Sequence, residues 1–113
     1  MNSILLEIKQ SIGLGEQETI FDSDIIMYIN SAFLNLLQLG VGPSIGFAIS
    51  DKTKTWNEFT TDLNILGYIK TYIFIKTKLL FDPPQTSFVL EALERQIQQI
   101  EWRLNVQAEG ETL

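Results

Sequence analysis

The chain contains neither cysteine nor histidine. Disulfide bonds, thiol nucleophiles, zinc sites built from these residues and imidazole acid–base chemistry are therefore all excluded. Basic residues are in the minority, with 8 Lys and Arg against 14 Asp and Glu and a net charge of −6. We do not expect a protein that binds phosphate backbones through a basic surface, and any DNA should lie near this protein rather than be bound by it.

Long uninterrupted hydrophobic runs are also missing. The most apolar segment, Ile65 to Phe81, is interrupted by Lys70, Lys76 and Lys78, so it does not match a membrane span. Residues 1–12 mix charged and polar side chains with apolar ones, and no cleavage-type sequence follows them, so no signal peptide is expected. We expect a protein that is intracellular when made and does not contact a membrane.

Helical periodicity is what the sequence does contain. Its 113 residues suffice for one domain with a core that needs no metal or disulfide. Apolar residues recur three and four positions apart in four segments, which predict helices over about 4–12, 22–39, 62–80 and 87–104. The fold class is therefore predicted to be mainly α, a small bundle of about four helices.

The third of these segments, Lys70 to Pro84 with the residues before it, is the most apolar part of the chain. A helix that is apolar on nearly all sides is typical of the centre of a bundle or of a surface shared between subunits. Asp82 precedes Pro83, and a residue before proline is pushed out of the α region, so the helix is predicted to end near Phe81.

A short β-hairpin is predicted between the second and third helices. Gly40, Pro43 and Gly46 prevent helix continuation, and Phe47 to Ser50 then alternates like a strand. The four residues after Ser50 read as a turn that leads to Thr55 and Trp56. The glycine-rich segment lacks the Lys-Ser/Thr of a phosphate-binding P-loop, so phosphate binding is not expected there.

Polar residues offer no convincing reaction centre. Asp22 with Asp24, and Glu91 with Glu94, form carboxylate pairs, but acids at a helix start stabilise its dipole and acids on a polar helix face are ordinarily solvated. Asn30 could bond to a neighbouring subunit, but a solvated helix surface is favoured. We predict no catalytic, cofactor-binding or metal-binding residues and no cofactor, and hence a protein that is not an enzyme.

A surplus of apolar and aromatic residues favours an oligomer. Hydrophobic residues make up 45% of the chain, which includes seven Phe, three Tyr and two Trp. On the last helix, Trp102 lies on a stripe separate from the main apolar seam, where an exposed indole is unfavourable unless another surface covers it. The candidates for subunit contacts, each with core burial as the competing explanation, are Tyr68, Phe74, Phe88 and Trp102.

The end of the chain differs from the rest in composition. Residues 105–113 are polar and acidic and contain Gly110, which predicts a flexible tail in the isolated chain. The predicted organisation is one helical domain over residues 1–104 followed by a flexible acidic tail over residues 105–113.

Several segments together resemble a known family. They are FDSDIIMYIN (21–30), LLQLGVGP (36–43), the region from Gly46 to Trp56, KTYIFIKTKLLFDPP (70–84) and EWRLN (101–105). In this order they are similar to head–tail connector proteins, also called adaptor or head-completion proteins, of long-tailed double-stranded-DNA phages and prophages. The resemblance covers nearly the whole chain and depends on the combination of LGVGP, LLFDPP and EWRLN, none of which carries chemistry by itself.

The resemblance implies a structural virion protein at the neck, assembled in the cytoplasm of the bacterial host. Its copies form a ring, commonly of twelve subunits, beneath the portal protein, extend the DNA channel and hold the next neck or tail-completion protein. DNA passes without sequence-specific binding, and a ring of negatively charged subunits would repel it rather than retain it. The closed ring suits heterologous contacts between apolar flanks.

The resemblance also suggests partner-binding segments. Glu109, Glu111 and Leu113 in the acidic tail become candidates for docking on the portal, and the region Gly40–Trp56 for contact with a neighbouring subunit or the tail-side protein. The full set of candidate interface residues is Phe47, Trp56, Tyr68, Phe74, Phe88, Trp102 and Arg103. The alternative is a small helical scaffolding or regulatory module that binds a partner through the apolar stripe of its last helix.

Overall fold

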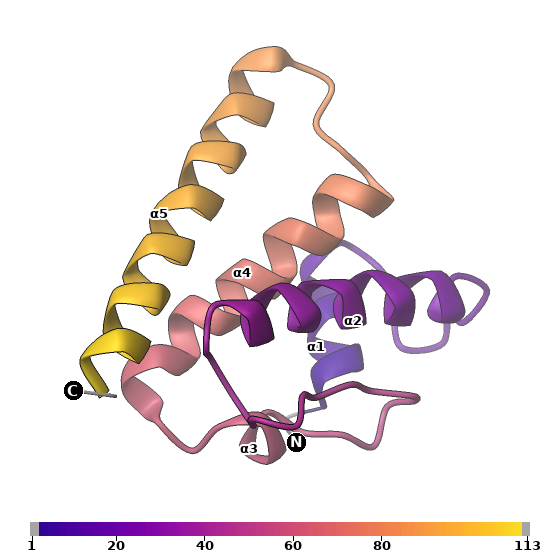
Figure 1. Ribbon diagram of the computed structural model, residues 1–113. Coiled ribbons are helices and arrows are strands. Elements are labelled where there is room, and N and C mark those ends of the chain that lie inside the picture. Colours follow the sequence, from indigo (N-terminus) through magenta and orange to yellow (C-terminus); the bar gives the residue numbers. More distant parts are fainter. Residues whose placement is uncertain (1–2, 112–113) are drawn as a thin grey trace.

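The computed structural model of the chain describes residues 3–111. Five helices follow one another in this part: α1 (Ile4–Ser11), α2 (Asp22–Gln38), α3 (Trp56–Phe59), α4 (Leu63–Phe81) and α5 (Ser87–Glu111). Figure 1 shows α4 running through the middle of the molecule, where it contacts α1, α2 and α5. The molecule is flat, with dimensions of 44 × 36 × 20 Å. The predicted mainly helical fold is confirmed.

The central helix α4 begins and ends at the residues its sequence indicates. The Asp62 carboxylate accepts a hydrogen bond from the backbone N–H of Asn64 at 2.9 Å, and Asp82, restricted by Pro83, follows the last helical residue Phe81. Contacts with three other helices explain why this helix is apolar on several sides. Its buried side chains are Ile69, Tyr72, Ile73, Ile75 and Thr77.

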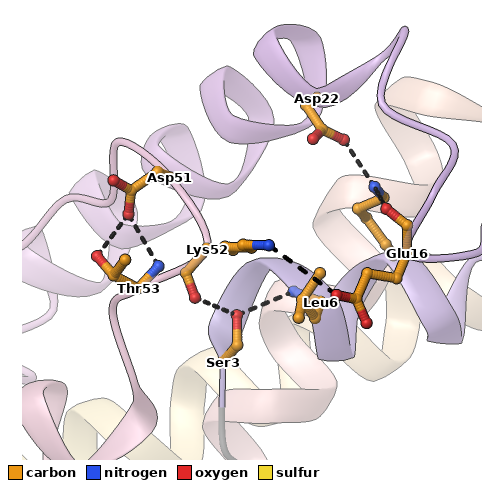
Figure 2. Close-up of polar contacts among 8 residues, drawn as sticks. Ser3, Leu6, Glu16, Asp22, Asp51, Lys52 and Thr53 are labelled. Carbon is orange, nitrogen blue, oxygen red and sulfur yellow. Dashed lines mark hydrogen bonds and ion pairs between the residues drawn. The ribbon is translucent and has the colours of Figure 1, made fainter.

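A buried lysine connects α1 to the start of α2. Lys9 is only 1% exposed, and its ammonium group lies 2.9 Å from the Asp22 carboxylate and donates to the backbone carbonyl of Glu16 at 3.2 Å. Figure 2 labels the residues that supply these two contacts, Glu16 on the α1–α2 loop (residues 12–21) and Asp22 on α2. Because a buried charge is tolerated only with such partners, the loop is fixed in position.

The predicted β-hairpin between α2 and α4 is wrong. No strand is present within residues 3–111, where the one β-bridge joins Ser3 to Thr55. Both backbone polar groups of Ile49 are instead bonded to the Asn30 side chain, at 2.8 and 2.9 Å. The two expected strands do not pair with each other, because Ile49 bonds to Asn30 and Thr55 bridges to Ser3. The expectation that Asn30 is merely solvated is wrong for the same reason.

The turn expected within that hairpin does form. The Asp51 carboxylate accepts a hydrogen bond from the backbone N–H of Thr53 at 2.8 Å, as Figure 2 shows. The chain then enters α3, a single helical turn that the sequence reading missed. Glu58 stabilises its start by accepting a hydrogen bond from the backbone N–H of Thr55 at 2.8 Å, which is half of a capping box.

An aromatic cluster holds the α2–α3 connection against the core. The rings of Phe33, Phe47 and Phe59 lie within 4.9 to 5.3 Å of one another, measured between centroids. Gly42 lies against this cluster with a φ of +91°, and a Cβ atom there would come within 2.5 Å of the Phe59 ring. Both the backbone conformation and the lack of space require glycine at this position.

The last helix, α5, extends beyond the predicted domain boundary at residue 104 and is helical through Glu111. It therefore includes residues 105–111, most of the stretch for which the sequence predicts a flexible tail. The boundary itself and the flexibility of that stretch in solution stay predictions. Leu113, the third tail residue proposed for docking, lies outside the described residues, and so does the side chain of Glu111.

Candidate interface on the α4 and α5 surface

Three of the seven predicted interface residues contribute to the core. Trp56 is 1% exposed, with the Lys70 ammonium 5.6 Å from its ring centroid. Phe47 is half-buried in the aromatic cluster, and Phe74 packs against the core from α4. The single turn of α3 directs the Trp56 indole into the core of the isolated subunit, and its role as an interface residue stays a prediction.

The other four predicted residues lie on the surface. Phe88 is 77% exposed and Trp102 is 67% exposed, while Tyr68 and Arg103 are exposed as well. Phe88 lies at the start of α5, well separated along the helix from the others. The structure brings Tyr68, Trp102 and Arg103 together, since they line one surface hollow.

Helical spacing explains why Trp102 points away from the core. Ile97, Ile100 and Leu104 are buried against the body of the molecule and occupy one face of α5. Trp102 lies two residues from both Ile100 and Leu104, about 200° around the helix, so it occupies the opposite face. Its exposure follows from the helix position itself.

An exposed cluster surrounds this indole. We call it the Trp102 patch, defined by residues from α4 and α5: Tyr68, Arg95, Gln99, Trp102, Arg103 and Val106. The Arg103 guanidinium lies 5.9 Å from the centroid of the Tyr68 ring, a cation–π contact that joins the two helices. A second hollow beside Trp102 is lined by two Arg and two Gln side chains and contains no carboxylate.

No ion pair neutralises the charge of the Trp102 patch in the part of the chain that the structure describes. Ion pairs to carboxylates are made by five lysines: Lys9, Lys52, Lys54, Lys70 and Lys78. The chain's two arginines, Arg95 and Arg103, make no such pair within residues 3–111. Glu91 and Glu109 lie further along the same side of α5, one turn before Arg95 and about two turns after Trp102. The centre of the patch is therefore cationic and aromatic.

A partly buried hydrogen bond beneath this surface sets the position of α5 on α4. The Tyr72 hydroxyl donates to a Glu101 carboxylate oxygen at 2.8 Å. Burial, followed by this contact with a carboxylate, raises the pKa of Tyr72 well above its ordinary value of 10.0. Glu101 immediately precedes Trp102, so the bond also fixes where the indole emerges.

The region between α2 and α4 presents a second candidate contact. A groove of about 540 Å³ lies between the Gly40–Pro43 turn, residues 57–62 and the C-terminal part of α5. Near it, Ile45 is 95% exposed at the tip of the connection. This groove and Ile45 are the accessible parts of the region Gly40–Trp56 that the sequence indicated as a partner contact.

The sequence reading missed several exposed apolar side chains away from α5. Ile20 in the α1–α2 loop is 82% exposed, Leu63 at the start of α4 is 80% exposed, and Met27 and Leu34 on α2 are about 60% exposed. Met27 and Leu34 are separated by seven residues, a spacing that places them on one helix face. The seven-residue spacing could have indicated an exposed apolar pair on α2, whereas nothing in the local sequence indicates that Ile20 is exposed.

The chain was compared with known proteins. The family model described as phage connector protein matches residues 4–111. No curated protein and no solved structure matches. Within the part that the structure describes, none of the helices combines the length and hydrophobicity needed to cross a membrane.

The match covers nearly the whole chain and agrees with the helical fold and with the absence of a predicted reaction centre. It assigns a structural role in joining head and tail proteins of the virion. The chain therefore belongs to the phage connector protein family, whose members are structural proteins rather than enzymes.

Proposed function

We propose that this protein assembles as a closed ring of about twelve copies beneath the portal at the capsid vertex, where it extends the DNA channel and carries the next neck or tail protein. The family match supports a connector role at the level of head and tail. The observation that carries the finer proposal is the Trp102 patch. A 67% exposed indole beside two arginines that make no ion pair within residues 3–111 is typical of a surface that a protein partner covers.

The proposed partners contact adjoining parts of the molecule, because the C-terminal part of α5 also lines the groove. The C-terminal end of α5, with Glu109 and Glu111 and the following Leu113, docks on the portal. The groove at Gly40–Pro43 and the exposed Ile45 contact the tail-side protein or a neighbouring subunit. Phe88 and the Trp102 patch remain for contacts between subunits.

The net charge is compatible with a DNA conduit. Each subunit carries −6, and repetition around a ring multiplies that charge. A negative channel wall would let a polyanion slide instead of retaining it. In this proposal the ring is located in the virion neck, having assembled in the cytoplasm of the bacterial host.

The proposal is tested in two steps. Virions produced without this protein are examined by electron microscopy, and the expected result is tailless or DNA-leaking heads. The purified chain is then mixed with portal and analysed by native mass spectrometry, where a ring of about twelve copies on the portal is expected. Normal virions in the first step, or a chain that stays monomeric and never joins portal, would refute it.

A further inference from the structure

The Trp102 patch has the chemistry to bind a carboxylate-rich, partly apolar segment. The hollow beside Trp102 contains two guanidinium groups, two amide side chains and the indole, without an acidic side chain. Guanidinium groups bind carboxylates through parallel hydrogen bonds, and the indole supplies apolar contact area. The partner segment should therefore present acids around a protruding aliphatic side chain.

One segment of the chain itself has this composition. We call residues 16–24 the acidic corner; it comprises the end of the α1–α2 loop and the first residues of α2. It contains four acids and no basic residue. Ile20 lies in its middle and is 82% exposed, with Phe21 beside it at 41%.

The acidic corner is held rigid before any partner arrives. Lys9 holds the Glu16 carbonyl and the Asp22 carboxylate, and Glu18 accepts a hydrogen bond from the backbone N–H of Gly15 at 2.7 Å. The Phe21 ring packs edge-on against Phe81, with centroids 5.3 Å apart. A preorganised segment loses little conformational entropy on binding, which favours affinity.

Acidic charge remains available at this corner. Glu16 is paired only with Lys52, at 4.0 Å and with both side chains largely exposed, which is a weak interaction. Asp24 is exposed and makes no ion pair within residues 3–111. Glu18 is exposed and accepts a hydrogen bond from a backbone N–H group, but it makes no ion pair within residues 3–111. Only Asp22 is neutralised by a close lysine.

The two surfaces lie at opposite sides of a flat molecule. In Figure 1, α5 forms the left side, and the α1–α2 loop and the start of α2 lie on the right. A subunit therefore cannot bring its own acidic corner onto its own patch. Two different surfaces on opposite sides are what a heterologous, ring-closing contact requires, because each subunit offers one to each neighbour.

We propose that the acidic corner of one copy of this chain seats on the Trp102 patch of the next copy, with Ile20 against the indole and Glu16, Glu18 and Asp24 facing Arg95 and Arg103. This inference rests on the ring of the proposed function and names the two surfaces that close it. The contact would neutralise the two arginines, which make no ion pair with a carboxylate within residues 3–111.

Charge exchange tests the pairing. Arg95→Glu with Arg103→Glu gives a net charge of −10, and Glu16→Lys with Asp24→Lys gives −2. We expect each double variant to raise the concentration needed for assembly by about tenfold or more, and the combination, again at −6, to recover most of the loss. Self-repulsion alone would predict that the −2 variant assembles better than wild type, which would contradict the pairing. Circular dichroism checks that each variant is folded.

Cross-linking tests the geometry. The chain has no cysteine, so Ile20→Cys and Gln99→Cys introduce the only two thiols. In the assembled protein, a short bismaleimide should join the doubly substituted chain into a ladder that ends in a closed species. Gln10→Cys with Gln99→Cys is the control, because Gln10 is exposed on α1, belongs to none of the proposed contact surfaces and should give little product.

The outcomes separate this inference from the proposed function. Assembled rings that cross-link from Thr112→Cys to Gln99→Cys, but not from Ile20→Cys, would show that the acidic tail occupies the patch, and the inference would be wrong. If Arg95→Glu with Arg103→Glu left ring assembly unchanged, the inferred pairing would also be wrong. The proposed connector role would not be affected by that result. Absence of any ring, alone or on portal, would refute the proposed function itself.

Discussion

The side-chain amide of Asn30 satisfies both backbone polar groups of Ile49, donating to its carbonyl at 2.9 Å and accepting from its N–H at 2.8 Å. Ile49 is 3% exposed, so neither group has ready access to water. One side chain on α2 therefore fixes the path of a loop nineteen residues further along the chain.

Replacing Asn30 by Ala should lower the free energy of unfolding by about 1–3 kcal/mol, because a buried donor and a buried acceptor are left without partners. Urea unfolding followed by circular dichroism measures the change. Ser31→Ala, at the exposed neighbouring position of α2, should change stability by less than about 0.5 kcal/mol. Equal effects at both positions would contradict this role of Asn30.

Two nearby aspartates should contribute unequally to stability, because only Asp22 pairs with the buried Lys9. Asp22→Ala should be strongly destabilising, by about 3 kcal/mol, because it leaves the lysine charge buried with only the Glu16 carbonyl as a partner. Asp24→Ala removes an exposed acid from the same helical turn and should cost about 0.5 kcal/mol through the lost dipole interaction. The measurement is thermal and urea unfolding of both variants in parallel.

Replacing each of two glycines by alanine should change the stability of the protein in opposite directions. Gly42→Ala should destabilise by about 1–3 kcal/mol, since φ is +91° and the new Cβ would collide with Phe59. Gly67→Ala, in α4 and with open space around it, should stabilise by about 0.5–1 kcal/mol through helix propensity. A destabilising result at Gly67 would indicate a contact that the isolated subunit lacks.

The raised pKa of Tyr72, beneath α5, predicts that the stability of the fold depends on pH in the alkaline range. Its folded-state pKa is raised above 10.0, so above about pH 10 the unfolded chain releases this proton while the folded chain retains it. Stability should therefore fall as pH rises from there, and Tyr72→Phe should remove part of that slope while costing about 1 kcal/mol at neutral pH. Urea midpoints at pH 7 to 11 for both proteins give the comparison; parallel curves would contradict the assignment.

Substitution of the two tryptophans should affect different properties: Trp56 is needed for folding and Trp102 for assembly. Trp56→Ala should cost about 3–5 kcal/mol, because the side chain fills the core, whereas Trp102→Ala should leave stability nearly unchanged. Assembly alone or on portal, followed by native mass spectrometry, should be impaired by Trp102→Ala in a fully folded protein. Normal assembly of that variant would remove the patch from consideration as an interface.

Local signals in the sequence were enough to place the main helices. Periodicity predicted the start of α4 at about residue 62, and the proline after Asp82 ends the helix through a steric effect that acts over a few residues. The cap itself is Asp62, an acid that the sequence prediction did not name as a cap. The exposure of Trp102 was likewise accessible, because helical period alone places it opposite Ile100 and Leu104.

The loop between α2 and α4 was beyond such local reasoning. Alternating apolar residues from Phe47 onward favour a strand, but Asn30 competes for the Ile49 backbone from a distant position. The inward position of Trp56 depends on α3, and Glu58 three residues after Thr55 was the capping signal that could have indicated it. The acidic corner could not be found from sequence, because the contacts of Lys9 with the Glu16 carbonyl and the Asp22 carboxylate that fix it form only in the folded chain.

The two ends of the long helix α5 are packed to different extents against the rest of the subunit. Its buried residues Ile97, Ile100 and Leu104 all lie beyond the first ten residues, and no side chain in residues 87–96 is fully buried. The first turns of the helix depend on backbone hydrogen bonds that can open with little loss of packing. Amide hydrogens there should exchange with deuterium quickly in the free subunit and slowly once Phe88 is covered, so the exchange rate of this helix end reports directly whether a neighbour is in place.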